Sequence, residues 1–360
     1  MEKFSFKTTI ISGAGSISAL EDYGAKRLFL VTDPYFMKNG AAGKLVSLSG
    51  CQAHEIFDRV TPDPTVELAA EGTARLRAFQ PDLIVALGGG STMDCAKAMA
   101  HFARSGAKLV AIPTTSGSGS EVTDFAILTH NKVKHPLVDE SLRPDVAILD
   151  SDLLMQLPKS LIADSGFDVL THALEAYTAR GAGPISDLYA QEAFRCAYAH
   201  LPASYAGKQE VRLKVHMAST MAGMAFTQAG LGLCHAMAHA LGGMFHVPHG
   251  RLNAILLPAV IGCNGVAAGK KYAELARAAG MGGSAETIAV RNLRNCLIRL
   301  RRELGLPETL AQAGVSSREV WNSAAQIVKA TLEDPCCSSN PVTVDDFMVR
   351  RILEAVTGRG

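Results

Sequence analysis

The sequence predicts an α/β domain with a parallel sheet, followed by a domain made only of helices. In the first half, short hydrophobic runs alternate with segments whose apolar residues recur at helical spacing, the pattern of crossover units in parallel sheets. After Pro158 the β-branched runs stop, and long segments rich in Ala, Leu and Met continue to the last residue. The length of 360 residues suits two domains, which we place at 1–158 and 159–360.

Four runs in the first domain are predicted to be buried strands, because hydrophobic residues are nearly continuous in them. They are Arg27–Thr32, Asp82–Leu87, Lys108–Pro113 and Asp145–Leu149. The segments 41–49, 65–79 and 93–103 carry apolar residues near helical spacing and are predicted to be helices. Strands that alternate with helices in this way favour a doubly wound parallel sheet.

The composition favours chemistry on small molecules. Lys and Arg number 35 against 34 Asp and Glu, so the net charge of +1 offers no general attraction to nucleic acid or anionic lipid. No run approaches the roughly 20 apolar residues of a membrane-spanning helix, and the first residues lack the apolar segment of a signal peptide. Eight cysteines are scattered without a CxxC pair, and the adjacent Cys336 and Cys337 are given no role. We therefore expect a cytoplasmic protein without nucleic-acid or membrane partners.

A glycine-rich segment, Gly88–Thr92, lies between a predicted strand and a predicted helix. The backbone N–H groups of Gly89, Gly90 and Ser91 would stand at the positive end of that helix, where they could bind a pyrophosphate. A tight turn would explain the same glycines, so this segment alone does not establish a ligand site.

A second cluster, Pro113–Glu121, follows the next predicted strand and is rich in Gly, Ser and Thr. Thr114 and Thr115 offer hydroxyl groups that could contact the ribose and nicotinamide end of a dinucleotide. Two such clusters at the carboxyl ends of parallel strands are hard to explain as turns alone, because ligands of α/β sheets bind at that edge. The pair therefore predicts a dinucleotide site.

Two charged residues are candidates for further contacts to this cofactor. Asp33 follows the strand at 27–32, where its carboxylate could accept a hydrogen bond from a ribose 2′-hydroxyl and would repel a 2′-phosphate, which favours NAD over NADP. The alternative is that Asp33 forms a turn before Pro34. Lys134 could place a positive charge near the cofactor, or it could be an ordinary surface lysine.

The second domain contains a cluster of potential metal ligands. Asp168 and His172 are four residues apart and would share one face of a helix, as would His235 and His239, while His249 follows Pro248 in the loop beyond. One carboxylate with several imidazoles suits Fe²⁺, Zn²⁺, Mn²⁺ or Co²⁺, and the lack of a thiol ligand argues against a structural zinc. A single histidine on an apolar helix is usually a core residue, but the joint pattern favours a catalytic metal.

With these segments the chain resembles the iron-containing (group III) alcohol dehydrogenases. The resemblance rests on segments spread over nearly the whole chain: 9–15, 88–91, 113–123, 166–177, 230–258 and 336–341. It implies a dinucleotide-binding domain, a helical catalytic domain and a divalent metal in the cleft between them. The family's metal ligands correspond to Asp168, His172, His235 and His249, its histidine near the substrate to His239, and its cofactor positions to Asp33, Gly89, Gly90, Ser91, Thr114, Thr115 and Lys134.

The resemblance also implies a reaction and a cellular setting. We expect NAD-dependent interconversion of short primary alcohols and aldehydes, with Fe²⁺, or Zn²⁺ or another divalent ion, as Lewis acid and His239 as the proton route. The opening residues 4–15 look most like 1-propanol and ethanol dehydrogenases of bacterial microcompartments, whose shell or enzymes would then be partners, and we expect a homodimer. The alternatives are a polyol dehydrogenase, a dehydroquinate-synthase-like lyase and a non-catalytic NAD-binding module.

Overall fold

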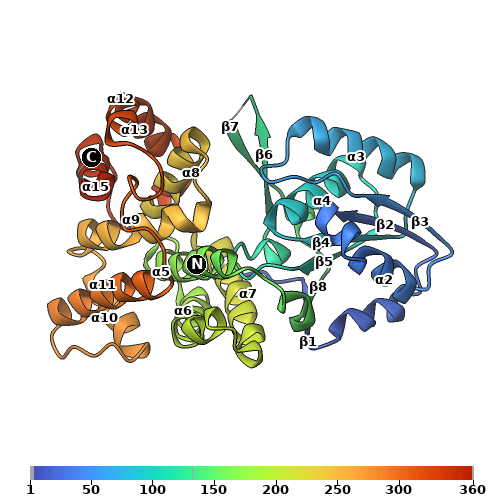
Figure 1. Cartoon of the computed structure of the whole chain (residues 1–360), viewed down its shortest axis with the longest axis horizontal. Helices are drawn as coiled ribbons and strands as arrows, with labels where there is room; N and C mark the ends of the chain where they lie inside the picture. The colour runs from blue at the N-terminus through green and yellow to red at the C-terminus, as the bar shows by residue number, and fades with distance from the viewer. Residues whose placement is uncertain (1–3, 132, 359–360) are drawn as a thin grey trace. The chain divides into compact units, whose positions relative to one another are not determined.

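The computed structural model describes residues 4–131 and 133–358, which fold as two compact units. The first unit is Ser5–Leu157, and the second comprises Phe4 and the chain from Pro158 onward. Figure 1 shows the strands gathered in the first unit and long helices in the second.

A six-stranded sheet forms the centre of the first unit, with strand order β1-β8-β5-β4-β2-β3. Every neighbouring pair in this sheet is parallel. Its strands are β1 (Thr9–Gly13), β2 (Arg27–Thr32), β3 (Ala53–Phe57), β4 (Leu83–Gly88), β5 (Lys108–Pro113) and β8 (Val146–Asp150). The predicted fold class, an α/β domain with a parallel sheet followed by a helical domain, is confirmed.

Helices cover both faces of this sheet. Leu45 of α2 packs with Leu28 and Leu30 of β2 on one face, whereas Leu76 of α3 and Met99 of α4 belong to the cluster on the other. The helices of this unit are α1 (Pro34–Lys38), α2 (Ala41–Leu48), α3 (Val66–Phe79) and α4 (Gly90–Ala103), with short 3-10 helices η1 (Ser16–Tyr23), η2 (Ser120–Val122), η3 (Glu140–Leu142) and η4 (Ser151–Leu154). The two layers bury the sheet on both sides, which explains the continuous hydrophobic runs.

The strand order reverses between β2 and β4. From β2 the chain passes through α2 to β3 on one side, whereas from β4 it passes through α4 to β5 on the other. In such sheets a crevice opens at the carboxyl ends of the two strands at the reversal, and ligands bind there. Asp33 follows β2 and Gly89 follows β4, so both predicted cofactor contacts lie at this point.

Four strands of this unit were not among the predicted ones: β1, β3, and the two strands of an antiparallel hairpin, β6 (Phe125–His130) and β7 (Val133–Val138). β1 and β3 are the edge strands of the sheet, and their side chains are only partly buried. An edge strand needs no continuous hydrophobic run, so its sequence gives a weaker signal.

The described residues of the second unit form helices joined by turns and irregular segments, without a strand. Its helices are α5 (Lys159–Thr178), α6 (Pro184–Tyr205), α7 (Arg212–Ala229), α8 (Leu233–Phe245), α9 (His249–Asn264), α10 (Gly269–Ala278), α11 (Glu286–Glu303), α12 (Ser317–Asn322), α13 (Ala324–Glu333), α14 (Cys336–Ser339) and α15 (Asp346–Thr357), with the 3-10 helix η5 (Gln209–Val211). Across the described residues, none of these helices combines the length and apolar character needed to cross a membrane.

Helix α5 is the central element of this unit and packs against α6, α7 and α9. The approach of α9 to α5 is very close at Gly250, where a Cβ atom would lie 2.0 Å from the carbonyl oxygen of Asp164. A salt bridge lies beside this contact: the Arg251 guanidinium donates to both carboxylate oxygens of Asp164, at 3.1 and 2.9 Å. These contacts fix α5 and α9 together just where both carry predicted metal ligands.

Candidate metal and cofactor sites

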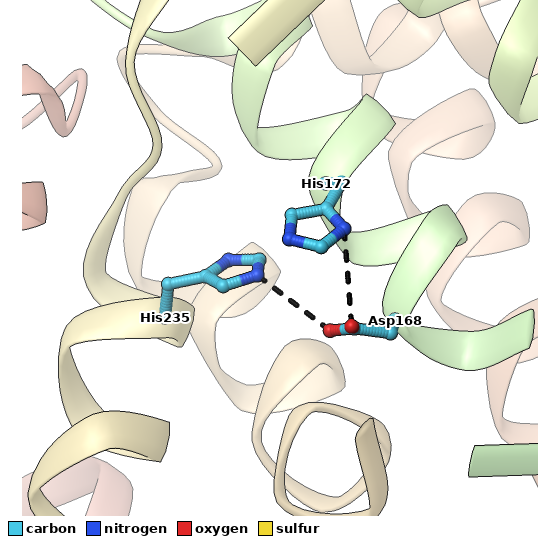
Figure 2. A group of neighbouring side chains, drawn as sticks. All are labelled: Asp168, His172 and His235. Carbon is cyan, nitrogen blue, oxygen red and sulfur yellow. Dashed lines mark ion pairs between the residues drawn. The ribbon is translucent and has the colours of Figure 1, made fainter. Parts of the chain in front are cut away.

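The four predicted metal ligands lie together on three helices. Asp168 and His172 are on consecutive turns of α5, His235 is in the first turn of α8, and His249 is the first residue of α9. The Asp168 carboxylate lies 4.0 Å from His172 Nδ1, 3.7 Å from His235 Nε2 and 3.5 Å from His249 Nε2. Figure 2 shows the imidazoles of His172 and His235 directed at this carboxylate.

This donor set fits a divalent metal ion. Ligand atoms about 2.1 Å from one ion lie roughly 3.0–3.4 Å from one another, so the separations of 3.5–4.0 Å require only a small contraction. A carboxylate oxygen and imidazole nitrogens are the ligands that Fe²⁺ and Zn²⁺ both accept. The residues are also buried, apart from the half-buried His249, which limits competition from water.

The pKa values of the site show that Asp168 is held as a carboxylate by the histidines around it. Burial opposes ionisation of this carboxyl group, but the surrounding histidines hold its pKa well below the usual range. For His235 burial favours the neutral form, yet hydrogen bonds to Asp168 and Glu175 raise its pKa to about 9. Burial lowers the pKa of His249 well below its ordinary value, so its imidazole is neutral and keeps a lone pair for a metal.

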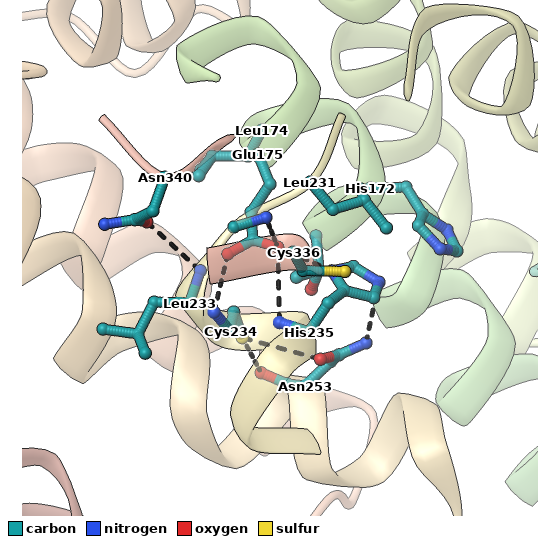
Figure 3. A network of polar contacts seen from close by, with 12 residues as sticks. His172, Leu174, Glu175, Leu231, Leu233, Cys234, His235, Asn253, Cys336 and Asn340 are labelled. Atoms are coloured by element: carbon teal, nitrogen blue, oxygen red, sulfur yellow. Dashed lines mark hydrogen bonds and ion pairs between the residues drawn. The ribbon is translucent and has the colours of Figure 1, made fainter. Parts of the chain in front are cut away.

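Glu175 is a buried carboxylate that was not predicted from the sequence. Its Oε2 accepts a 2.6 Å hydrogen bond from Nδ1 of His235, and its two oxygens also accept from the backbone N–H groups of Gly232 and Cys234 (Figure 3). A proton held on Nδ1 leaves Nε2, the atom that faces Asp168, to bind a metal. Glu175 lies three residues after His172 on α5, so the helical spacing that pairs Asp168 with His172 could have identified it.

Asn253 is a second polar residue that was missed. It lies one turn after His249 on α9, and its Nδ2 donates to the Asp168 carboxylate at 2.7 Å. The same nitrogen is 3.4 Å from Nε2 of His235 and 3.3 Å from Nε2 of His249. Three of the predicted ligand side chains therefore surround the Asn253 amide nitrogen. Asn253 thereby holds the Asp168 carboxylate, while Glu175 holds Nδ1 of His235.

His239, the predicted proton route, lies beside the four ligands. Its ring stacks on that of His249 with 5.1 Å between centroids, and its Nδ1 is 2.9 Å from the carboxylate of Asp334. Burial opposes ionisation of Asp334, but the hydrogen bond from His239 lowers its pKa overall. Asp334 lies 95 residues away in sequence, and no local pattern could have linked the two.

Five of the predicted cofactor residues, Gly89, Gly90, Ser91, Thr114 and Thr115, lie where the chain leaves the carboxyl ends of the adjacent strands β4 and β5. Gly89 is the N-cap of α4, and Gly90 and Ser91 begin that helix, while Thr114 donates its backbone N–H to the carbonyl of Gly88 at 2.9 Å. A Cβ atom on Gly89 would lie 3.3 Å from the Thr115 side chain, so the loops approach closely. The arrangement presents a helix N-terminus next to a hydroxyl-rich loop, which is suited to a pyrophosphate.

Asp33 and Lys134 have structural partners as well. Oδ1 of Asp33 accepts hydrogen bonds from the backbone N–H groups of Tyr35 and Phe36, at 2.9 and 3.3 Å, and so caps α1. The Lys134 amine forms an ion pair with Asp63 at 2.7 Å. The turn role considered for Asp33 is therefore present, and the cofactor roles of both residues stay predictions.

Lys97, on α4, was not singled out from the sequence but anchors the second loop. Its fully buried amine donates to the backbone carbonyl of Ser120 at 2.9 Å, to the Ser120 hydroxyl at 3.0 Å and to the Thr123 hydroxyl at 2.9 Å. Asp94, one turn earlier on α4, accepts from the same Ser120 hydroxyl at 2.6 Å. Burial lowers the pKa of Lys97 to about 8, although neighbouring carboxylates oppose this.

Comparisons with known proteins agree with this architecture. A family model for iron-containing alcohol dehydrogenase matches residues 7–151, and one for the C-terminal part of the Fe-containing alcohol dehydrogenase family matches residues 162–357. The chain is 37% identical to an NADPH-dependent butanol dehydrogenase of Clostridium saccharobutylicum over 99% of this chain and 98% of that one. It is 38% identical to the 1-propanol dehydrogenase PduQ of Citrobacter freundii, over 98% and 99%. A crystal structure of 1,3-propanediol oxidoreductase superposes with a TM-score of 0.93 at 32% identity, over 98% and 99% of the two chains.

Proposed function

The chain belongs to the iron-containing alcohol dehydrogenase family, and on that premise we propose that it is a metal-dependent, NAD(H)-linked enzyme that interconverts short primary alcohols and aldehydes. Pairs such as 1-propanol with propanal and ethanol with acetaldehyde are the proposed substrates, with aldehyde reduction regenerating NAD. The observation that carries this proposal is the convergence of Asp168 with His172, His235 and His249 on three helices.

These four residues would hold the metal. A bound divalent ion would polarise an alcohol or carbonyl oxygen and so favour hydride transfer. We propose Fe²⁺ as this ion, with Zn²⁺ as the alternative that the same ligands accept. Glu175 and Asn253 keep the ligand atoms directed inward through their bonds to His235 and Asp168.

We propose that His239 transfers the proton of the reaction. Asp334 accepts the Nδ1 hydrogen, which fixes the ring and leaves Nε2 as the atom that can take up or donate a proton. The His239→Ala variant is expected to lower kcat by about 10²–10⁴-fold. Metal content at the proposed centre should stay at the wild-type level, as measured by elemental analysis. Loss of that metal would instead make His239 a ligand.

The proposed cofactor is NAD, with its pyrophosphate at the N-terminus of α4 near Gly89, Gly90 and Ser91. Thr114, Thr115 and Lys134 are proposed as further contacts, and Asp33 as the ribose contact that disfavours a 2′-phosphate. The butanol dehydrogenase of Clostridium saccharobutylicum is described as NADPH-dependent, so the preference of this chain needs a direct comparison of the two cofactors.

The first experiment measures oxidation of NADH with propanal by anaerobically purified enzyme, loaded with Fe²⁺, loaded with Zn²⁺ or stripped by a chelator. We expect activity that disappears on stripping and returns best with Fe²⁺. NADPH and a phosphorylated aldehyde serve as controls. No activity in any loaded sample that holds metal and NAD would contradict the proposal.

A polyol substrate is the second candidate, because the 1,3-propanediol oxidoreductase has nearly the same fold. The two candidates are separated by comparing kcat/KM for 1-propanol, 1,3-propanediol and glycerol in the oxidative direction. A higher value for 1-propanol supports the simple alcohol, and a higher value for either polyol supports the alternative.

We also propose a cytoplasmic homodimer. The likeness to the 1-propanol dehydrogenase PduQ and the resemblance to microcompartment-associated enzymes support a location inside a bacterial microcompartment, with shell or enzyme partners. Sedimentation of the purified enzyme tests the dimer. Fractionation of cells that express a microcompartment tests the location, because an encapsulated enzyme sediments with the shell.

A further inference from the structure

A second group of potential metal ligands lies outside the four residues described above. His239 is on α8, Asp334 follows the end of α13, and Cys336 is the first residue of α14. One ligand atom from each lies within 4.8 Å of the other two. All three residues are partly buried, so the group is reachable from solvent yet shielded by protein.

Asp334 is at the centre of this group. Its Oδ2 lies 2.9 Å from Nδ1 of His239, and its Oδ1 accepts the backbone N–H of Cys336 at 2.9 Å. The thiol of Cys336 also hydrogen-bonds to this carboxylate, and burial raises the thiol pKa well above its ordinary value. Three hydrogens, two on nitrogen and one on sulfur, are thus directed at the same carboxylate.

We propose that His239, Asp334 and Cys336 form a second metal site, which takes a thiophilic divalent ion such as Zn²⁺. One imidazole, one carboxylate and one thiolate are three ligands that Zn²⁺ commonly accepts, with water in the fourth position. Ligand atoms around such an ion lie about 3.3–3.8 Å apart, so side-chain movements of roughly 1 Å would complete the site.

Binding requires only proton movement. The S–H bond of Cys336 breaks, a bond from sulfur to the ion forms, and the proton leaves to solvent. The neutral imidazole of His239 moves its proton from Nδ1 to Nε2, so that Nδ1 can bind the ion. Nothing is oxidised or reduced.

The second group of ligands differs from the first in the ions that it favours and in the effect of a bound ion on the reaction. The first set has three imidazoles and no thiol, whereas the second has a thiol and a single imidazole, so soft ions are favoured only in the second. An ion in the second site would hold His239 by Nδ1 and place a proton on Nε2. The site would therefore be inhibitory, a consequence that rests on the proposed role of His239 in proton transfer.

Co²⁺ is the probe for this site, because a cobalt–thiolate bond gives a charge-transfer absorption in the near ultraviolet that carboxylate and imidazole ligands do not give. Enzyme with its first site filled by Co²⁺ is titrated with more Co²⁺, and bound metal is counted. We expect a second equivalent per chain together with the thiolate absorption. Absence of the second equivalent from the wild-type enzyme would overturn the proposal.

Cys336→Ser tests the thiol, and Cys337→Ser is the matched control, since the Cys337 thiol instead donates to the carbonyl of Thr331 at 2.9 Å. Cys336→Ser should keep the first equivalent, lose the absorption and bind the second at least tenfold more weakly, while Cys337→Ser should behave as wild type. Persistence of the absorption in Cys336→Ser, or its loss in Cys337→Ser alone, would refute the assignment.

Two further measurements extend the test: one replaces a second residue of the site, and the other asks whether binding affects activity. Should Cys336→Ser not fold, His239→Ala must lose the second equivalent and keep the first, and any other result counts against the site. Added Zn²⁺ should reduce the activity of Fe²⁺-loaded wild type and Cys337→Ser, but not the activity of Fe²⁺-loaded Cys336→Ser. If the second equivalent binds without inhibition, the metal site stands and the role of His239 fails.

Discussion

A single buried carboxylate, Glu175, controls the orientation of His235. It accepts the Nδ1 hydrogen of that ring at 2.6 Å and also holds the backbone N–H groups at the start of α8. A carboxylate hydrogen-bonded to a metal-binding histidine fixes its tautomer and makes it a stronger ligand. The residue therefore belongs to the proposed metal centre although it would not touch the ion.

Replacing Glu175 with Gln is expected to weaken metal affinity by about 10–100-fold, because the negative charge behind His235 is lost while the side-chain shape is kept. The measurement is a competition of the purified enzyme against a chelator of known affinity. Glu192→Gln, on the exposed face of α6, is the control and should leave the affinity unchanged. Equal affinity of Glu175→Gln and wild type would remove Glu175 from the metal centre.

Lys97 provides a pH-dependent contribution to stability in the first unit. Burial lowers its pKa in the folded protein from the ordinary value of 10.5 to about 8. Between these values the unfolded chain binds more protons than the folded one, so the free energy of unfolding rises with pH. The folded state is therefore penalised below pH 8 by the buried charge, and this penalty disappears as the pH rises.

Lys97→Met lacks this titration and serves to isolate it. We expect the free energy of unfolding of wild type, relative to Lys97→Met, to increase from pH 8 to pH 10. Urea unfolding at several pH values measures the difference, in which the other titrating groups largely cancel. A difference that stays constant, or falls, over this range would show that the Lys97 amine is not neutralised in the fold.

At the scale of elements, the packing of α9 on α5 depends on Gly250. A Cβ atom there would lie 2.0 Å from the backbone carbonyl oxygen of Asp164, which cannot move without displacing α5. Gly250→Ala is expected to destabilise the protein by at least about 2 kcal/mol and to reduce metal binding, since α5 and α9 carry three of the four proposed ligands.

Gly262→Ala on the same helix is the matched control. No atom lies within 4 Å of the Cβ position at Gly262, so the substitution should stabilise the helix by about 0.5–1 kcal/mol. Thermal unfolding and metal content of the two variants are compared. Similar behaviour of both alanines would mean that the close approach at Gly250 is relaxed at little cost.

The elements predicted most accurately from the sequence are those in which the hydrophobic pattern alone identifies the element. The interior strand β2 has the predicted bounds of Arg27–Thr32, because a strand buried on both faces is hydrophobic at every position. The edge strand β3 was missed because only its last residue is fully buried. Hydrophobic patterning reports burial, and an edge strand is held instead by backbone bonds to one neighbour.

The same limit applies to the candidate site. Residues paired at helical spacing, such as Asp168 with His172, were recognised because one helix turn brings them together. Glu175 and Asp334 act on histidines 60 and 95 residues distant, and only the packing of helices decides these pairings. A local motif can therefore predict which side chains become neighbours on one helix, while the contacts that orient them from other helices depend on the tertiary fold.

At the scale of the whole molecule, the proposed metal would stabilise one unit and not the other. All four proposed ligands belong to the unit that begins at Pro158, on α5, α8 and α9. A ligand that binds only the folded state stabilises it by about 2.7 kcal/mol when its free concentration is 100 times its dissociation constant. The residues proposed to bind the NAD pyrophosphate, Gly89, Gly90 and Ser91, belong to the other unit, Ser5–Leu157.

Removal of the metal is therefore expected to destabilise the helical unit selectively. Hydrogen exchange followed by mass spectrometry measures this, because it assigns protection to segments of the chain. Stripping with a chelator should speed exchange in α5, α8 and α9 and leave β2, β4 and β5 unchanged, whereas added NAD should protect the start of α4. Equal loss of protection in both units after stripping would show that the chain unfolds as one cooperative body, and no change in α5, α8 or α9 would place the metal elsewhere.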